Sequence, residues 1–179
     1  YSNYATAGGG GIYVASGDVT INNAKISYNY TLDEDSNNIA HGGGIYIASG
    51  NLTLEDTEVS YNRGYQGAGV KCYSDNAGTV TLKHATIKGN AGNVPSWHNF
   101  GGGVVIKNFT LNCDTSTEAS IIEENYSGDG GALFLENTNL LYALSISDVQ
   151  IGTVRETFVV NQFMYTHRVE YGKKYGDFK

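Results

Sequence analysis

The sequence predicts an all-β fold, a right-handed parallel β-helix of about five coils with three short strands each. One observation is a glycine cluster that recurs five times and is followed each time by an apolar strand. The repeats that it starts begin near residues 8, 42, 67, 101 and 130. A second is the alternation of apolar and polar residues within the strands, which is the period of a half-buried strand. Self-similarity of this kind indicates a solenoid, because a single coil has no second layer against which to bury its apolar face.

The strand after each glycine cluster predicts two inward columns of side chains. One column contains Ile12, Ile45, Val70, Val104 and Leu133. The other contains Val14, Ile47, Cys72, Ile106 and Leu135. The residues between them, Tyr13, Tyr46, Lys71, Val105 and Phe134, are expected on the outward side. Coils that stack at the strand spacing of about 4.8 Å bring each column into contact.

Two further segments complete each coil. The second strands are expected at 19–21, 52–54, 80–82, 109–111 and 144–146. The third segments begin at Ile26, Val59, Ile87 and Ile122, and each ends in an asparagine. Ile151 occupies the matching place in the last coil, without that asparagine. The asparagines Asn29, Asn62, Asn90 and Asn125 are expected to form a hydrogen-bonded ladder along one corner.

The glycines are interpreted as structural. Gly10, Gly43, Gly102 and Gly131 mark one corner, where a sharp turn or a close backbone approach favours glycine. A phosphate-binding loop is excluded, because it requires a Lys-Ser/Thr pair and a following helix.

These two motifs, a GGxI-type glycine motif and an apolar-x-x-Asn motif, resemble the repeats of the chlamydial polymorphic outer membrane proteins. They are also similar to the wider set of pectin-lyase-like β-helix surface proteins. The resemblance covers residues 8–152. It implies a secreted or surface-exposed chain that is often adhesive. The phenylalanine usual in the second motif is replaced here by isoleucine or valine.

Domain organisation and charge agree with that setting. Residues 1–152 are assigned to the coils, and residues 153–179 to a cap or a connection to a further domain. Residues 1–4 resemble the tail of an earlier coil, so a processed chain or a piece of a longer protein is expected, with a neighbouring domain or subunit at that end. The net charge of −7 argues against nucleic acid as a partner. No apolar run is long enough to span a membrane.

The candidate binding residues lie where the coils differ, in the long connections 30–41 and 91–100. Trp97, His98 and Phe100, with His41 from the other connection, suit a glycan or protein partner, although Trp97 alternatively packs onto its own coil. Tyr13 and Tyr46 form a second candidate surface. Asp33, Glu34 and Asp35 are candidate ligands for Ca²⁺, or else a solvated loop tip.

Two cysteines and four sequons add minor expectations. Cys72 is expected as a buried apolar filler and Cys113 within an insertion, and their pairing stays open. If the source is eukaryotic and secretory, Asn51 and Asn108 are the better glycosylation candidates, because Asn29 and Asn125 belong to the ladder.

The sequence therefore predicts a non-enzymatic module, extracellular or on the cell surface, that is adhesive or a structural scaffold and needs no cofactor. One alternative is a carbohydrate-active β-helix enzyme of the polysaccharide lyase or hydrolase type, although no paired acids are evident. The other is a subunit that associates end to end into a filament or a larger surface assembly.

Overall fold

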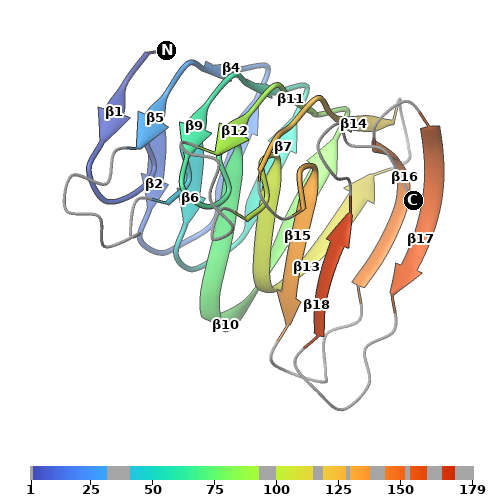
Figure 1. The fold of residues 1–179 in the computed structure, drawn as a ribbon. Helices are drawn as coiled ribbons and strands as arrows, with labels where there is room; N and C mark the ends of the chain where they lie inside the picture. Colours follow the sequence, from blue (N-terminus) through green and yellow to red (C-terminus); the bar gives the residue numbers. More distant parts are fainter. Residues whose placement is uncertain are drawn as a thin grey trace.

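The computed structural model describes residues 2–31, 41–92, 100–114, 119–127, 130–137, 144–151, 154–160 and 167–171. Parallel strands stack coil upon coil along one axis, from the blue N-terminal end to the red C-terminal end (Figure 1). No helix occurs in these described ranges. The prediction of an all-β solenoid with parallel stacked coils is confirmed.

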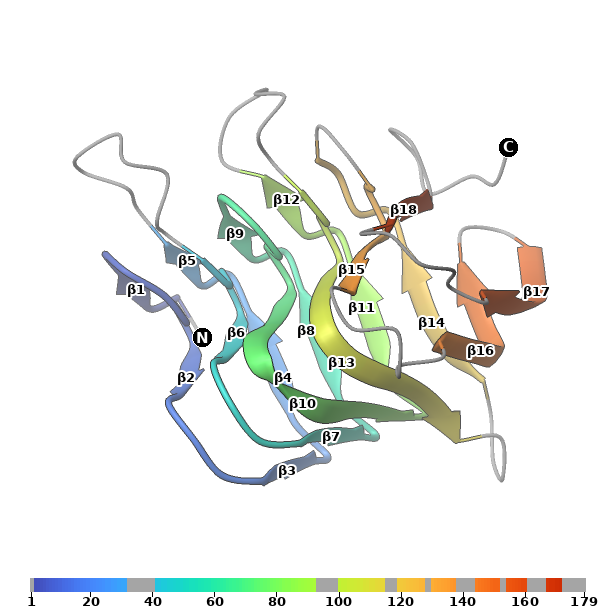
Figure 2. The same ribbon diagram turned by 90° about the horizontal axis from the view of Figure 1, so that it is seen from below.

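The first sheet contains the strands that follow the glycine clusters, in the order β18-β15-β13-β10-β6-β2, and also β3 and β7. Its strands are β2 (Ile12–Val14), β3 (Val19–Asn22), β6 (Ile45–Ile47), β7 (Leu52–Glu55), β10 (Val70–Lys83), β13 (Val104–Asp114), β15 (Leu133–Asn137) and β18 (His167–Tyr171). β3 pairs with β7, and β7 pairs with the second half of β10 (Figure 2).

The second sheet contains the third segment of each coil, in the order β17-β16-β14-β11-β8-β4. Its strands are β4 (Lys25–Ser27), β8 (Glu58–Ser60), β11 (Thr86–Lys88), β14 (Ser120–Glu123), β16 (Leu144–Ile151) and β17 (Val154–Val160). A third, short sheet was not expected from the sequence. Its strands follow the ladder asparagines and are β1 (Tyr4–Ala5), β5 (Tyr30–Thr31), β9 (Arg63–Gly64) and β12 (Ala91–Gly92).

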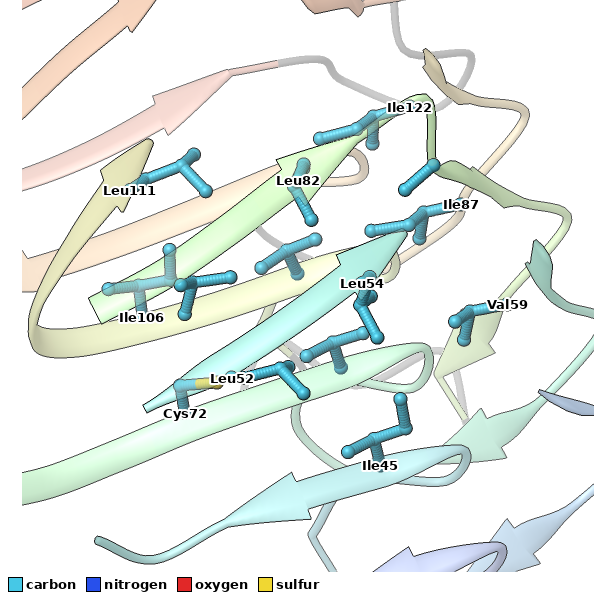
Figure 3. Close-up of a cluster of buried hydrophobic side chains, with 14 of the residues drawn as sticks. Ile45, Leu52, Leu54, Val59, Cys72, Leu82, Ile87, Ile106, Leu111 and Ile122 are labelled. Carbon is cyan, nitrogen blue, oxygen red and sulfur yellow. The ribbon is translucent and has the colours of Figure 1, made fainter. Parts of the chain in front are cut away.

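Both inward columns of the first sheet have the register that the sequence predicts. Ile12 pairs with Ile45, Ile45 with Val70, Val70 with Val104, and Val104 with Leu133. The third segments are also in register, with Ile122 paired to Ile151. From Ile45 to Leu135 the inward side chains of the first sheet are buried, and with Val59, Ile87 and Ile122 they meet in one continuous core (Figure 3).

The predicted alignment of the second strands is wrong in the last two repeats. Val80 pairs with Leu111 rather than with Phe109, which instead pairs with Gly78. A side chain at position 78 would collide with the Phe109 ring, so glycine there makes room for the phenylalanine. Residues 144–146, expected as a second strand, lie in β16 of the second sheet. Alternation alone does not detect a slip of two residues, because such a slip keeps the same face inward.

The asparagine ladder is present and fully hydrogen-bonded between neighbouring coils. The backbone N–H and Nδ2 of Asn62 both donate to Oδ1 of Asn90, at 2.9 and 3.0 Å. Asn29 bonds to Asn62, and Asn90 to Asn125, in the same way. The second hydrogen of Asn62 Nδ2 goes to the carbonyl of Ile26 in the preceding coil. The ladder begins at Asn3, one step before Asn29, where the sequence predicts its start. The backbone N–H and Nδ2 of Asn3 both donate to Asn29 Oδ1.

Each glycine cluster contains three positions with different constraints. The first position has positive φ in every repeat, at Gly9, Gly42, Gly67, Gly101 and Gly130. The second holds Gly10, Gly43, Gly102 and Gly131, with Ala68 in the third repeat; a Cβ at Gly10 would lie 2.5 Å from the Gly43 carbonyl oxygen. The third lies against the ladder, since a Cβ at Gly44 would come within 2.9 Å of Asn62 Nδ2.

The C-terminal strands pair in the opposite sense to the coils. β17 is antiparallel to β16, and β18 is antiparallel to β15. They therefore occupy the outer edges of the last strands of both larger sheets, as Figure 1 shows at the red end. A capping role for residues 153–179 stays a prediction.

Asn62→Ala is expected to lower the free energy of unfolding by about 3 kcal/mol. The change leaves two donors of Asn29 without an acceptor at a buried site, and each unsatisfied group costs about 1–3 kcal/mol. Urea denaturation measures the difference. Asn22→Ala, at an exposed position of β3, is the matched control and is expected to change stability by less than about 0.5 kcal/mol. Equal losses in both variants would contradict the role of the ladder.

Gly69→Ala is expected to destabilise the fold by about 2 kcal/mol, because the new methyl group would meet the Gly103 carbonyl oxygen at 2.5 Å and Asn90 Nδ2 at 2.9 Å. Asn90→Ala removes one of these two contacts. The double variant should therefore lose less stability than the sum of the two single variants, by about 1 kcal/mol. Strict additivity in urea denaturation would show that the glycine and the amide do not interact.

Candidate functional site

Several of the residues singled out from the sequence lie outside the described residues. These are the metal candidates Asp33, Glu34 and Asp35, and the binding candidates Trp97 and His98. His41, Phe100, Tyr13 and Tyr46 are described, and all four contact the first sheet or its glycine corner.

The outward row of the first sheet has the predicted register but not the predicted exposure. Tyr13, Tyr46 and Lys71 pair in sequence, and their row continues to Val105 and Phe134. Tyr13 is 55% exposed and its ring centroid lies 5.4 Å from that of Tyr46. Lys71, Val105 and Phe134 are at most 2% exposed. The outward side is therefore open at Tyr13 and closed from Lys71 to Phe134, and the binding role of Tyr13 and Tyr46 stays a prediction.

The side chains that precede the glycine clusters contact the outward row of the first sheet, either in their own coil or in the next one. His41, Gln66 and Phe100 immediately precede their glycine clusters and pair through backbone bridges. The His41 ring packs edge-on against Tyr46, with 5.9 Å between centroids. In the next repeat, Lys71 Nζ donates a hydrogen bond of 2.7 Å to Gln66 Oε1. The Phe100 ring stacks on Phe134 at 4.8 Å, which explains part of the burial of that row.

Lys71 is the most unusual of these side chains, because it is a lysine with 1% exposure. Its Nζ lies 4.4 Å from the centre of the Tyr73 ring and 5.6 Å from that of Tyr46. Burial lowers the pKa of Lys71 to about 7, with Glu136 opposing and Lys107 reinforcing the shift. Near neutral pH the uncharged form of this amine is therefore far more populated than in an exposed lysine.

Two tyrosine pairs lie outside the ladder corner, on either side of the asparagines. Tyr28 stacks on Tyr61, and Tyr4 stacks on Tyr30; in both pairs the centroids are 5.4 Å apart and the ring planes differ by 17°. We call these four residues the tyrosine platform. The exposed fractions of Tyr4, Tyr28 and Tyr61 are 61%, 50% and 43%.

The platform was missed in the sequence, although its signal is visible in the ladder motif. Tyr28 and Tyr61 directly precede ladder asparagines, and both have positive φ, at 59° and 54°. Gly89 takes the corresponding place in the next repeat, with φ of 62°. A Cβ on Gly89 would lie 2.6 Å from the Tyr61 ring, so the glycine lets that ring extend over it.

A second surface feature, also unexpected, is an open groove of about 440 Å³ between the second and third segments. Its lining includes Asp56 and His84, joined by a contact of 2.8 Å between Oδ1 and Nδ1. Asn23, Asp56 and His84 all have positive φ and directly follow the stacked strands β3, β7 and β10. Both members of the contact are about half exposed, so their interaction is weak.

The two glycosylation candidates differ in exposure. Asn51 is exposed and donates through Nδ2 to Asp18 Oδ1. Asn108 is 3% exposed and its Nδ2 donates to the Ser74 carbonyl. The expectation of a glycan at Asn108 is therefore wrong for the folded chain, because burial leaves no room for one.

The cysteines are not paired with each other. Cys72 is fully buried in the core column, as expected, and burial raises the pKa of its thiol. Cys113 lies within β13 opposite Leu82, rather than in an insertion, because of the two-residue slip described above. It packs against the core as a partly buried side chain.

Phe100→Ala is expected to lower the free energy of unfolding by about 2 kcal/mol, because it removes a partly buried ring and its stacking on Phe134. Tyr126→Ala removes an exposed ring without a described stacking partner and should cost less than about 1 kcal/mol. Thermal or urea denaturation measures both. A loss at Phe100 no larger than that at Tyr126 would contradict its role in covering the sheet.

Comparison with known proteins gives no relative from which to infer function: no protein-family model, curated protein or solved structure matches the chain. Within the described ranges, no helix has both the length and the apolar character needed to cross a membrane. The same part of the chain brings together no three His, Cys, Asp or Glu side chains suited to a metal ion. The surface geometry of the chain is therefore the basis for a functional proposal.

Proposed function

We propose that the protein is a non-enzymatic binding module, extracellular or on the cell surface, whose tyrosine platform contacts a glycan. The observation that carries the proposal is the stack of Tyr28 on Tyr61 at two positions of positive φ. The adhesive role implied by the resemblance to polymorphic outer membrane protein repeats and to pectin-lyase-like surface proteins agrees with such a platform.

The backbone at these two positions favours glycine over tyrosine. A left-handed conformation costs an ordinary residue about 1–2 kcal/mol, and Gly89 avoids that cost at the corresponding place. Stacking of two rings returns only about 0.5–1.5 kcal/mol per pair. Stacking alone therefore does not offset the backbone cost at the two positions, which supports a role for the tyrosines in a contact outside the chain.

The chemistry of the platform suits a neutral sugar. A tyrosine ring offers an apolar face to the C–H groups of a pyranose, and its hydroxyl group can bond to a sugar hydroxyl. In the described part of the chain, the large exposed hydrophobic side chains are all tyrosines: Tyr4, Tyr13, Tyr28, Tyr61 and Tyr126. The stacked coils hold the rings in place before binding, so little side-chain entropy is lost on contact. The net charge of −7 disfavours strongly acidic polymers.

We also propose that the coils wind in the right-handed sense and number five. Connections between parallel strands of one sheet are right-handed in nearly all proteins. The register from β2 through β6, β10 and β13 to β15 supports five successive repeats.

Tyr28→Gly and Tyr61→Gly are the sharpest tests of this function. Each should abolish glycan binding, a loss of tenfold or more in affinity, while the free energy of unfolding stays within about 1 kcal/mol, because relief of backbone strain offsets the lost stacking. A glycan array identifies the ligand, and titration with the best glycan measures affinity.

Asn23→Gly is the matched control, since Asn23 is exposed, has φ of 49° and lies away from the ladder corner. It should retain full binding. If the wild-type chain binds no glycan, or if the tyrosine variants bind as well as Asn23→Gly, the proposed function is wrong.

A further inference from the structure

The contact between Gln66 and Lys71 is the most chemically unusual arrangement in the described residues. A glycine corner at Gly67, with φ of 62°, turns the chain so that these two side chains meet. Lys71 Nζ lies 2.7 Å from Gln66 Oε1, which places a primary amine directly against a carboxamide. The same corner in the preceding repeat holds His41 against Tyr46 and has no such pair of reactive groups.

We propose that Lys71 and Gln66 condense to form an intramolecular isopeptide bond across the glycine corner. The class of modification is a self-catalysed transamidation, in which an amine replaces ammonia on a side-chain amide. It requires no cofactor and no partner. It is independent of the glycan-binding function proposed above, because Gln66 and Lys71 lie outside the tyrosine platform.

The surroundings of Lys71 favour this reaction in two ways. Lys71 is 1% exposed and its Nζ lies near the Tyr46 and Tyr73 rings, so few water molecules solvate the amine. Burial also lowers the pKa of Lys71 to about 7, so the unprotonated, nucleophilic form is abundant at neutral pH. An exposed lysine, with a pKa near 10.4, is less than about 0.1% unprotonated at pH 7.

Proximity supplies the remaining advantage. Amides react slowly with amines in dilute solution, but fixed neighbours reach effective concentrations on the order of 10⁵ M or more when they are well oriented. The hydrogen bond holds Nζ 2.7 Å from Oε1, the oxygen that is bonded to the reacting carbon Cδ. Stacked strands on either side of the corner restrain both residues, because Gln66 bridges His41 and Phe100 through its backbone.

The reaction balances without an oxidant or reductant. The lone pair of neutral Nζ attacks Cδ of Gln66, forming the new C–N bond and a tetrahedral centre. One proton then passes from Nζ to Nε2 of Gln66, the Cδ–Nε2 bond breaks, and ammonia leaves. The product is a secondary amide with one remaining N–H.

Mass spectrometry of the full chain tests the proposal directly. The folded protein, incubated at pH 8, should have a mass lower than that of its sequence by one ammonia. Trypsin does not cleave after an acylated lysine, so digestion should yield a peptide spanning residues 64–83 instead of cleavage after Lys71. Fragmentation of that peptide should locate the loss to the Gln66–Lys71 pair. An unchanged mass with normal cleavage after Lys71 would overturn the proposal without any variant.

Three variants and a pH series confirm the assignment. Lys71→Met and Gln66→Met should each restore the full mass, whereas Lys107→Met, which removes the other lysine over Tyr73, should keep the ammonia loss. For chain purified in urea and then refolded, the initial rate should rise about thirtyfold from pH 5.5 to pH 8 and level off above, following the neutral amine. A loss of ammonia that persists in Lys71→Met, or a rate that keeps rising to pH 10, would contradict the assignment to this buried amine.

Discussion

The fit of each ladder amide against a glycine Cα is the constraint on which the rest of the structure depends. In four repeats, the third glycine of the cluster leaves a gap that the amide of the same coil fills: a Cβ on Gly11, Gly44, Gly69 or Gly103 would come within 2.9 Å of that Nδ2. The glycine motif and the asparagine motif are thus two halves of one corner. Because the amide also bonds to both neighbouring coils, the corner fixes the spacing and the register of the stack together.

The last repeat shows the same dependence in reverse. Ala132 stands where the other repeats have the third glycine, and the position three residues after Ile151 holds Val154 rather than asparagine. Where the asparagine amide is absent, the facing cluster position no longer has to be glycine, and alanine is found there. At that end the strand partners change as well, since antiparallel β18 follows β15. Loss of the corner thus coincides with the end of parallel stacking.

The sequence predicts the corner and the core columns well, because both rest on residue types that repeat in every coil. Features peculiar to one coil were harder to predict. The two-residue slip in strand register at Phe109 depends on Gly78 alone. The alternation of apolar and polar residues does not reveal it. Lys71 Nζ lies near the ring of Tyr46 in the preceding coil as well as near Tyr73 of its own strand, and the first of these contacts is not visible in the sequence of one strand. The tyrosine platform was overlooked because φ at Tyr28 and Tyr61 is set by the corner rather than by the side chain, so tyrosine there looks unremarkable in a list of residues.

A corner that fixes the backbone so tightly leaves the side chains outside it free to differ from coil to coil. Before the ladder asparagine, the successive repeats have Tyr28, Tyr61, Gly89 and Glu124, all with positive φ. Before the glycine cluster they have His41, Gln66 and Phe100, all in one bridged column. In both columns the backbone is constant while the chemistry varies. The fold therefore accepts several residue types at these positions, and contacts outside the chain or reactivity can differ from coil to coil. This separation explains how a repetitive scaffold comes to hold a stacked aromatic pair at one place and a buried amine against an amide at another.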